Sequence, residues 1–235
     1  MIDKSCIIID DEDQQEIIEN LKVDAERYGI RLICYQMNPQ TEPFYKNIGN
    51  KSVPEYVIDL NKVSAALLTK DFRKLRVDVI ACDYDLGDDE VNGYELIRRL
   101  RFHLNYRKEV ILYSGNLDRV VRAIVRQEDP KEQFNQIKNL ARARIREFND
   151  KNDYRQSIIS AVRDEAFSLE SELERLLEKY SDWTFRSTFP EFRGMKLSSV
   201  LDEIEAGSAE GKKFQKALLE NAVSHMIDLN RINDE

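Results

Sequence analysis

The chain has 235 residues, of which 42% are hydrophobic and 34% charged, and its formal net charge is −8. This composition supplies a core for one or two domains and excludes collagen-like, disordered and purely coiled-coil classes. The acidic balance disfavours nucleic acid as a partner, and no apolar run reaches the roughly 18 residues of a membrane span.

The first half of the chain alternates short apolar runs with amphipathic stretches. Strands are expected at 5–9, 30–35, 77–82, 110–113 and about 143–148, and helices at 14–28, 61–74, 94–104 and 117–126. Continuous apolar strands that alternate with helices are typical of βαβ units. The sequence therefore predicts an α/β fold with a doubly wound parallel sheet of five strands, buried on both faces.

Two stretches interrupt this rhythm. Residues 36–60 contain three prolines and no hydrophobic period, so we expect a long loop. Residues 119–146 carry eight basic and three acidic residues and are expected to be helical, with an interruption near Pro130. Such a stretch is usually a charged helix face, and binding of nucleic acid is the alternative.

From about residue 152 the pattern becomes purely helical. Apolar residues follow a heptad spacing at Ile159, Val162, Ala166, Leu169, Leu173, Leu176 and Tyr180. This seam predicts one long helix. It either pairs with a second copy as a coiled coil or packs against two further helices of the same chain, expected at 197–206 and 209–230. Ser208 is the expected N-cap of the last helix.

An aromatic loop separates the long helix from the last two helices. It contains Trp183, Phe185, Phe189 and Phe192. These side chains are either docking anchors for a partner or the core of a small helical subdomain.

The N-terminal sequence MIDKSCIIIDDED lacks the pattern of a signal peptide, so a cytoplasmic location without a membrane partner is expected. Cys6, Cys34 and Cys82 are odd in number and lack the pairing of a metal site. They imply no disulfide framework and are expected to be buried as small hydrophobic residues.

Carboxylates follow two of the predicted strands. Asp10 and Asp11 come directly after the first strand, and Asp83 comes directly after the third. Because the carboxyl ends of parallel strands share one edge, these side chains are expected to meet there. Crowded carboxylates raise one another's pKa, and a hard cation such as Mg²⁺ relieves the repulsion. Ser114 closes the fourth strand at the same edge, where its hydroxyl is placed to donate to a bound oxyanion.

Four motifs resemble those of the response-regulator receiver domain. They are CIIIDDE at 6–12, VDVIACDYDL at 77–86, NGYELIRRLR at 92–101 and VILYSG at 110–115. The resemblance covers roughly residues 4–163. It implies a flavodoxin-like receiver at 1–163, with insertions at about 36–60 and 119–142, followed by a helical extension at 164–235.

The resemblance also implies the chemical roles of the acidic residues. Asp83 corresponds to the phospho-acceptor, which attacks a phosphoryl group as a nucleophile. Asp10, Asp11 and Asp83 are implied to bind Mg²⁺, and the backbone carbonyl of Asp85 completes the protein ligands.

Three further positions are assigned through the same resemblance. Ser114 is implied to hydrogen-bond the phosphoryl group, and Lys151 to pair with its oxygens. Phe148 lies three residues before that lysine, where the family has a switch aromatic, although a plain core position is the favoured interpretation. Asn152 stands where the family has a proline.

The implied function is that of a response regulator that is not an enzyme beyond slow autodephosphorylation. Its partner is a sensor histidine kinase or a phosphotransfer protein, and its output is homodimerisation or binding of a downstream protein through the helical extension. Two alternatives remain open. One is a receiver-like interaction module that phosphate does not switch, and the other is a DNA-binding regulator that uses the 119–146 stretch.

Overall fold

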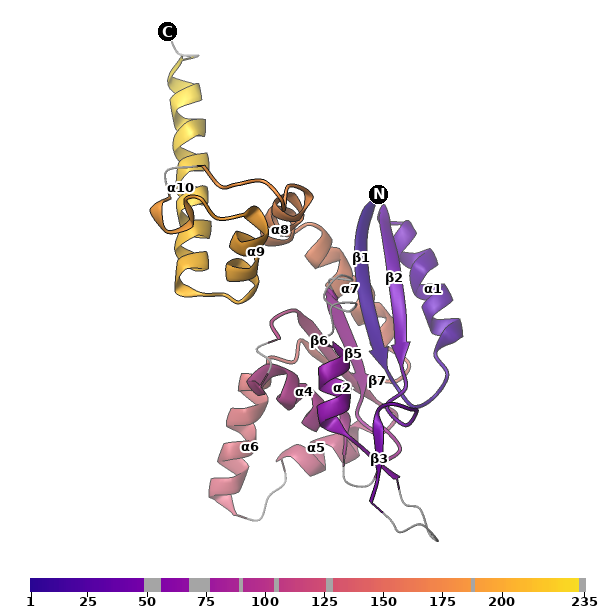
Figure 1. Cartoon of the computed structure of the whole chain (residues 1–235). Coiled ribbons are helices and arrows are strands. Elements are labelled where there is room, and N and C mark those ends of the chain that lie inside the picture. Colours follow the sequence, from indigo (N-terminus) through magenta and orange to yellow (C-terminus); the bar gives the residue numbers. More distant parts are fainter. Residues whose placement is uncertain are drawn as a thin grey trace. The chain divides into compact units, whose positions relative to one another are not determined.

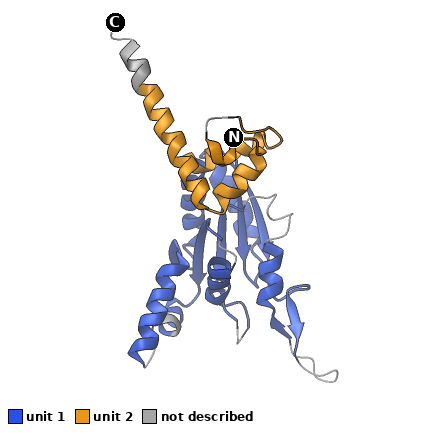
Figure 2. Cartoon of the chain, turned by 60° about the vertical axis from the view of Figure 1, so that its left-hand side comes forward, with its two compact units in different colours: residues 1–166 blue, residues 167–235 orange. Residues whose placement is uncertain are grey.

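The structure is a computed structural model of the chain. It describes residues 1–48, 56–67, 77–88, 91–103, 106–125, 129–186 and 189–232. Two compact units make up the chain, Met1–Ala166 and Phe167–Glu235, and Figure 2 colours them separately. The boundary expected at 163/164 lies inside the last helix of unit 1. Among the described residues, no helix is both long enough and apolar enough to cross a membrane.

A five-stranded parallel sheet forms the centre of unit 1 (Figure 1). Its strands are β1 (Ile2–Ile9), β2 (Ile30–Met37), β5 (Val79–Asp83), β6 (Glu109–Ser114) and β7 (Glu147–Asp150). They lie side by side in the order β2-β1-β5-β6-β7. Counted along the chain, this order is 2-1-3-4-5, which is that of the flavodoxin-like doubly wound fold. The predicted fold class is confirmed.

Helices cover both faces of this sheet (Figure 1). They are α1 (Gln15–Glu26), α2 (Leu60–Leu67), α4 (Gly93–His103), α5 (Leu117–Val125), α6 (Pro130–Ala143) and α7 (Tyr154–Ala166). Side chains alternate between the faces of a strand. In β1, Cys6 and Ile8 therefore pack with α1 and α7, while Ile7 and Ile9 pack into a second cluster with α4. Burial on both faces explains why the strands are continuously apolar.

The first interrupting stretch is not the unstructured loop that the sequence suggests. It contains a short antiparallel hairpin, in which β3 (Tyr45–Asn47) pairs with β4 (Tyr56–Ile58). The Tyr, Val and Ile residues there have high β-propensity, which favours strands even though the two segments are too short to show a hydrophobic period. Residues 49–55 and 68–76 lie outside the described residues, so the end of the helix expected at 61–74 is not tested.

The second interrupting stretch forms two helices, as the break near Pro130 predicts. Helix α6 begins at Pro130, and the Asp129 side chain caps it by accepting the Lys131 N–H at 3.0 Å. The helix ends at Ala143, and Arg144 follows with a positive φ of 48°. The last strand consequently begins later than expected, at Glu147.

The expected long helix is wrong, because the seam is divided between two helices. Helix α7 ends at Ala166, and α8 (Leu169–Lys179) begins after Ser168, whose hydroxyl accepts the Ser171 N–H at 3.0 Å. Such a serine cap starts a new helix rather than continuing the old one. Ile159 belongs to the core of unit 1, and Leu173 packs against the core of unit 2. Each half of the seam therefore contributes to the core of its own unit.

Unit 2 has its own core between α8, α9 (Leu197–Glu205) and α10 (Ala209–Ile232). Phe214 lies at its centre, with the rings of Phe185 and Phe189 at 5.3 and 5.4 Å. The aromatic loop thus supplies core residues, whereas Trp183 is 67% exposed. Ser208 accepts the Gly211 N–H at 2.9 Å, which confirms the predicted cap of the last helix.

A buried ion pair holds β1 beside β5 at the end of the sheet opposite the acidic residues. Lys4 Nζ lies 3.1 Å from Asp78 Oδ1, and the Ser5 N–H donates to Asp78 Oδ2 at 2.8 Å. Burial raises the pKa of Asp78, and Lys4 opposes that shift. Removing the ammonium alone would leave a buried carboxyl group without its main partner.

We expect Lys4→Met to lower the free energy of unfolding by about 3 kcal/mol, because a buried charge loses its counter-ion. Urea denaturation at pH 7 measures this loss. Arg31→Gln is the matched control, since Arg31 pairs with Asp3 on the exposed surface of β1 and β2. That variant should lose little stability, because solvent screens the exposed pair. Equal losses in the two variants would contradict the importance of burial.

Candidate functional site

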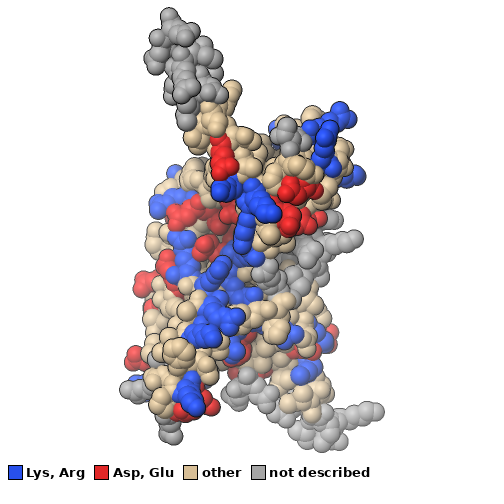
Figure 3. Space-filling model, turned by 90° about the vertical axis from the view of Figure 1, so that its left-hand side faces the viewer, with Lys and Arg blue, Asp and Glu red and all other residues tan. Residues whose placement is uncertain are grey.

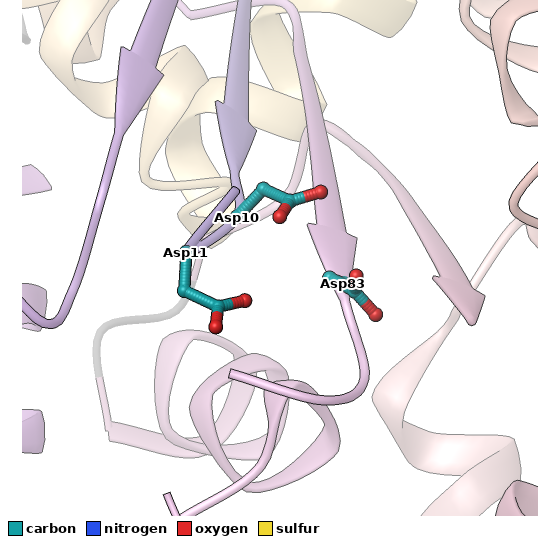
Figure 4. A group of neighbouring side chains, drawn as sticks. All are labelled: Asp10, Asp11 and Asp83. Carbon is teal, nitrogen blue, oxygen red and sulfur yellow. The ribbon is translucent and has the colours of Figure 1, made fainter. Parts of the chain in front are cut away.

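Three carboxylates meet at the carboxyl edge of the sheet (Figure 4). Asp10 and Asp11 follow β1, and Asp83 is the last residue of β5. The two strands are neighbours, with Ile9 opposite Cys82. One oxygen from each carboxylate lies within 4.8 Å of the others. The sequence prediction that these side chains converge is confirmed.

Asp10 is completely buried and is surrounded by hydrogen-bond donors. Gln14 Nε2 and the Tyr113 hydroxyl both donate to its Oδ2 at 2.8 Å, and the Glu12 N–H donates to its Oδ1 at 2.8 Å. Tyr154 stacks on Tyr113 with ring centroids 3.9 Å apart and donates to Gln14 Oε1 at 2.7 Å. These donors hold the carboxylate in a single orientation.

Sequence reasoning missed this buried network. Its members come from the start of α1, the end of β6 and the start of α7, and no sequence period connects them. The only local signal is that Gln14 stands four residues after Asp10.

Lys151 lies beside Asp83. Its backbone N–H donates to the Ser114 carbonyl at 3.1 Å, and the lysine lies just beyond the end of β7. Its Nζ lies 2.9 Å from Asp83 Oδ2, 2.9 Å from Glu12 Oε2 and 3.5 Å from Asp10 Oδ2. An ammonium group there partly neutralises the crowded carboxylates.

Ser114 and Asp85 also lie at this edge. The Ser114 hydroxyl accepts the Asn116 N–H at 3.0 Å and stands 3.4 Å from Asp85 Oδ2. Asp85 Oδ1 pairs with Arg119 at 2.9 Å, and the Asp85 N–H donates to Asp83 Oδ1 at 3.1 Å. The hydroxyl thus supports the turn into α5 and donates to the Asp85 carboxylate at the same edge of the sheet.

Phe148 is not a core residue, so that interpretation of the sequence is wrong. It lies on β7, at the edge of the sheet, and is 38% exposed. An edge strand has only one neighbouring strand, and here its outer face is not fully covered.

Burial and neighbouring charges both shift the pKa values of the titratable groups at this edge. Burial raises the pKa of Asp83 from its ordinary 3.8 to about 6, Lys151 opposes this rise, and Asp10 adds to it. Burial also raises the pKa of Asp11, as do the neighbouring Asp10 and Glu12. The Lys151 hydrogen bond lowers the pKa of Glu12. Burial disfavours the charge of Lys151, but its bonds to Glu12 and Asp83 outweigh this and raise its pKa.

The donor set fits a hard divalent cation. Three carboxylates offer oxygen atoms within 4.8 Å of one another. Mg²⁺ prefers oxygen ligands, and its two positive charges would compensate a cluster that a single nearby ammonium neutralises only in part.

In the metal-free protein, the raised pKa of Asp83 makes the folded state less stable as the pH rises. The folded state binds this proton more tightly than the unfolded state, so stability is retained below pH 4 and falls as the pH rises through about 6. We expect Asp83→Asn to remove this loss and to stabilise the metal-free chain at pH 7.5 by on the order of 1–2 kcal/mol. Urea denaturation with a chelator at pH 4 and pH 7.5 measures the difference.

Asp118→Asn is the matched control for that experiment, because Asp118 is an exposed carboxylate on α5. It should change stability little at either pH. A gain for Asp83→Asn that is as large at pH 4 as at pH 7.5 would contradict the titration of Asp83 as its cause.

Comparison with known proteins gives similarities of structure only. No protein-family model matches the chain, and no curated protein matches it. A sensor protein from Polaromonas sp. JS666 matches with a TM-score of 0.38 and 13% identity, over 68% of this chain and 94% of that one. A response regulator receiver protein from Pseudomonas putida matches with a TM-score of 0.37 and 14% identity, over 70% and 98%.

RcsB from Salmonella enterica serovar Typhimurium, bound to promoter rprA in the presence of the phosphomimetic BeF3-, matches with a TM-score of 0.37 and 15% identity. That match covers 90% of this chain and 99% of the other. The matched structures include a signal receiver domain from Clostridium thermocellum. Similarities this low assign no activity to the chain, and its fold class follows from the order of its strands.

Proposed function

We propose that the chain is a response regulator that accepts a phosphoryl group on Asp83 from a phosphohistidine of a partner protein. The donor is a sensor histidine kinase or a phosphotransfer protein, and the reaction depends on Mg²⁺. The observation that carries this proposal is the Lys151 ammonium, 2.9 Å from the Asp83 carboxylate and beside the three-carboxylate cluster. A lysine so placed suits a phosphoryl group on that carboxylate.

In the proposed reaction, a carboxylate oxygen of Asp83 attacks the phosphorus of the phosphohistidine. An O–P bond forms to give an acyl phosphate, the N–P bond breaks, and its electron pair returns to the imidazole of the donor. Asp10, Asp11, Asp83 and the Asp85 carbonyl would hold Mg²⁺, which would supply positive charge for the phosphoryl oxygens. Lys151 pairs with one of those oxygens, and the Ser114 hydroxyl donates to another.

The phosphoryl group therefore stays on Asp83, and the chain acts as a phospho-acceptor rather than as an enzyme that turns over substrate. Hydrolysis of the acyl phosphate would reset it slowly. The acyl phosphate on Asp83 would shift the protein between two conformations. In the phosphorylated one, Ser114 and Lys151 leave their present partners and bind the phosphoryl oxygens. Those present partners include Asp85 for Ser114 and Glu12 for Lys151.

The proposed output is binding of a protein, or of a second copy, through unit 2. That unit carries exposed apolar side chains outside its own core, among them Leu169, Trp183 and Met226. Residues 165–235 contain fifteen acidic and nine basic residues, which disfavours nucleic acid as the ligand of this unit.

Incubation of the chain with acetyl phosphate and Mg²⁺, or with a phosphorylated histidine kinase, should add one phosphoryl group to the intact mass. Asp83→Asn should abolish the addition, because the nucleophilic carboxylate is gone. Asp118→Asn should incorporate phosphate as the wild-type chain does. An unchanged yield in Asp83→Asn would refute the assignment of the acceptor. No incorporation into the wild-type chain from either donor would favour the interaction module that phosphate does not switch.

Lys151→Met should slow this phosphorylation by about 100-fold, because one charged group no longer stabilises the transferring phosphoryl oxygens. Binding of Mg²⁺ should persist, since the three carboxylates remain. The initial rate of incorporation at saturating Mg²⁺ measures the effect. Lys22→Met, at an exposed position on α1, is the matched control and should keep the wild-type rate. A wild-type rate for Lys151→Met would remove the lysine from the mechanism.

A second candidate function is binding of DNA by the stretch 119–146 of unit 1, which carries eight basic and three acidic residues. On the face that Figure 3 draws, Lys and Arg side chains are interspersed with Asp and Glu side chains. Part of the basic character serves the fold, because Arg101 donates to the carbonyls of Ala143, Tyr106 and Arg144. A mobility shift that weakens as salt is raised would support this function, and no shift at low salt would exclude it.

A further inference from the structure

The segment that follows β2 contacts the loop that carries Asp11. Asn38 Nδ2 donates to the Asp11 carbonyl at 2.9 Å, and Asn38 Oδ1 accepts the Gln40 N–H at 2.9 Å. One asparagine side chain therefore connects the backbone of a proposed metal ligand to the backbone of Gln40.

The side chain of Gln40 reaches the loop after Asp83. Its Nε2 donates to the Leu86 carbonyl at 3.0 Å and to the Gly87 carbonyl at 2.7 Å. Gly87 has a φ of +66°, and a Cβ built there would lie 1.9 Å from Gln40 Nε2 and 2.6 Å from Asp11 Oδ2. The Gln40 amide, the Gly87 backbone and the Asp11 carboxylate thus lie close together, and a side chain at residue 87 would have to displace the other two groups.

A third contact joins the same two regions. The Ile58 N–H, in β4, donates to Asp88 Oδ2 at 2.7 Å, while Asp88 Oδ1 accepts the Val91 N–H at 2.9 Å. The segment between β2 and α2 therefore binds three consecutive residues, 86–88, of the loop after Asp83. This loop also carries Asp85, whose carbonyl is an expected cation ligand.

We propose that Gln40 is a positioning residue for the divalent cation. Together with Asn38 it forms a bridge from the Asp11 backbone to residues 86 and 87, and so sets the spacing between the two loops that carry the ligands. This inference rests on the proposed function only in requiring a cation held by Asp11 and Asp83. Ligand geometry at a metal site must be held closely, and hydrogen-bond partners outside the ligand shell provide that restraint.

Isothermal titration calorimetry of Mg²⁺ binding to the unphosphorylated 235-residue chain tests the bridge. Gln40→Met keeps the length and volume of the side chain but removes both N–H donors. We expect it to raise the dissociation constant for Mg²⁺ about tenfold. The free energy of unfolding of the metal-free chain should stay unchanged, because Gln40 is exposed.

Gln15→Met is the matched control. Gln15 is also exposed, and its amide donates to Glu19 on α1 rather than to a ligand-bearing loop. It should bind Mg²⁺ as the wild-type chain does.

Three outcomes would overturn the bridge. They are wild-type affinity in Gln40→Met, equal weakening in Gln15→Met, and a loss of metal-free stability in Gln40→Met that accounts for its weaker binding. In each of these cases Mg²⁺ binding by the wild-type chain would leave the proposed function intact. A wild-type chain that bound no Mg²⁺ would instead overturn the proposed function, and this inference with it.

Discussion

Mutual repulsion among three carboxylates is the constraint on which the rest of the site depends. Asp10, Asp11 and Asp83 offer oxygen atoms within 4.8 Å of one another at the end of two adjacent strands. Such a cluster is tolerated because Asp10 accepts three hydrogen bonds in a buried network and because Lys151 brings an ammonium to Asp83 and Asp10. The remaining imbalance of charge is what makes the site suitable for a cation and a transferred phosphoryl group.

The doubly wound sheet creates this crowding. Parallel strands β1, β5 and β6 end at the same edge, so residues that are about 30 and 70 positions apart along the chain become neighbours. Apolar side chains on both faces of each strand hold the edge in place. Around it, the segment between β2 and α2 adds hydrogen bonds to both acidic loops, which a simple strand-to-helix turn would not supply.

Unit 2 follows a different principle. Its core is built around the rings of Phe185, Phe189, Phe192 and Phe214, which meet largely edge to face. Edge-to-face contacts satisfy the quadrupoles of aromatic rings and give a small helical unit a large buried area. Leu173 packs at the margin of this core, while Leu169 and Leu176 remain exposed on the same helix. The heptad spacing therefore serves an internal core as well as a free surface.

Local pattern by itself determined the five strands of the parallel sheet, most helices and the meeting of Asp10, Asp11 and Asp83, because hydrophobic period and strand polarity act over neighbouring residues. It also indicated Lys151 and Ser114, through motif resemblance. Only the tertiary structure showed that Tyr113 and Gln14 donate hydrogen bonds to Asp10 and that Gln40 donates to the Gly87 carbonyl. It also showed that the heptad seam is interrupted at Ser168, where a new helix begins. Those outcomes depend on contacts between distant segments and on which core each helix joins, and no single stretch of sequence carries that information.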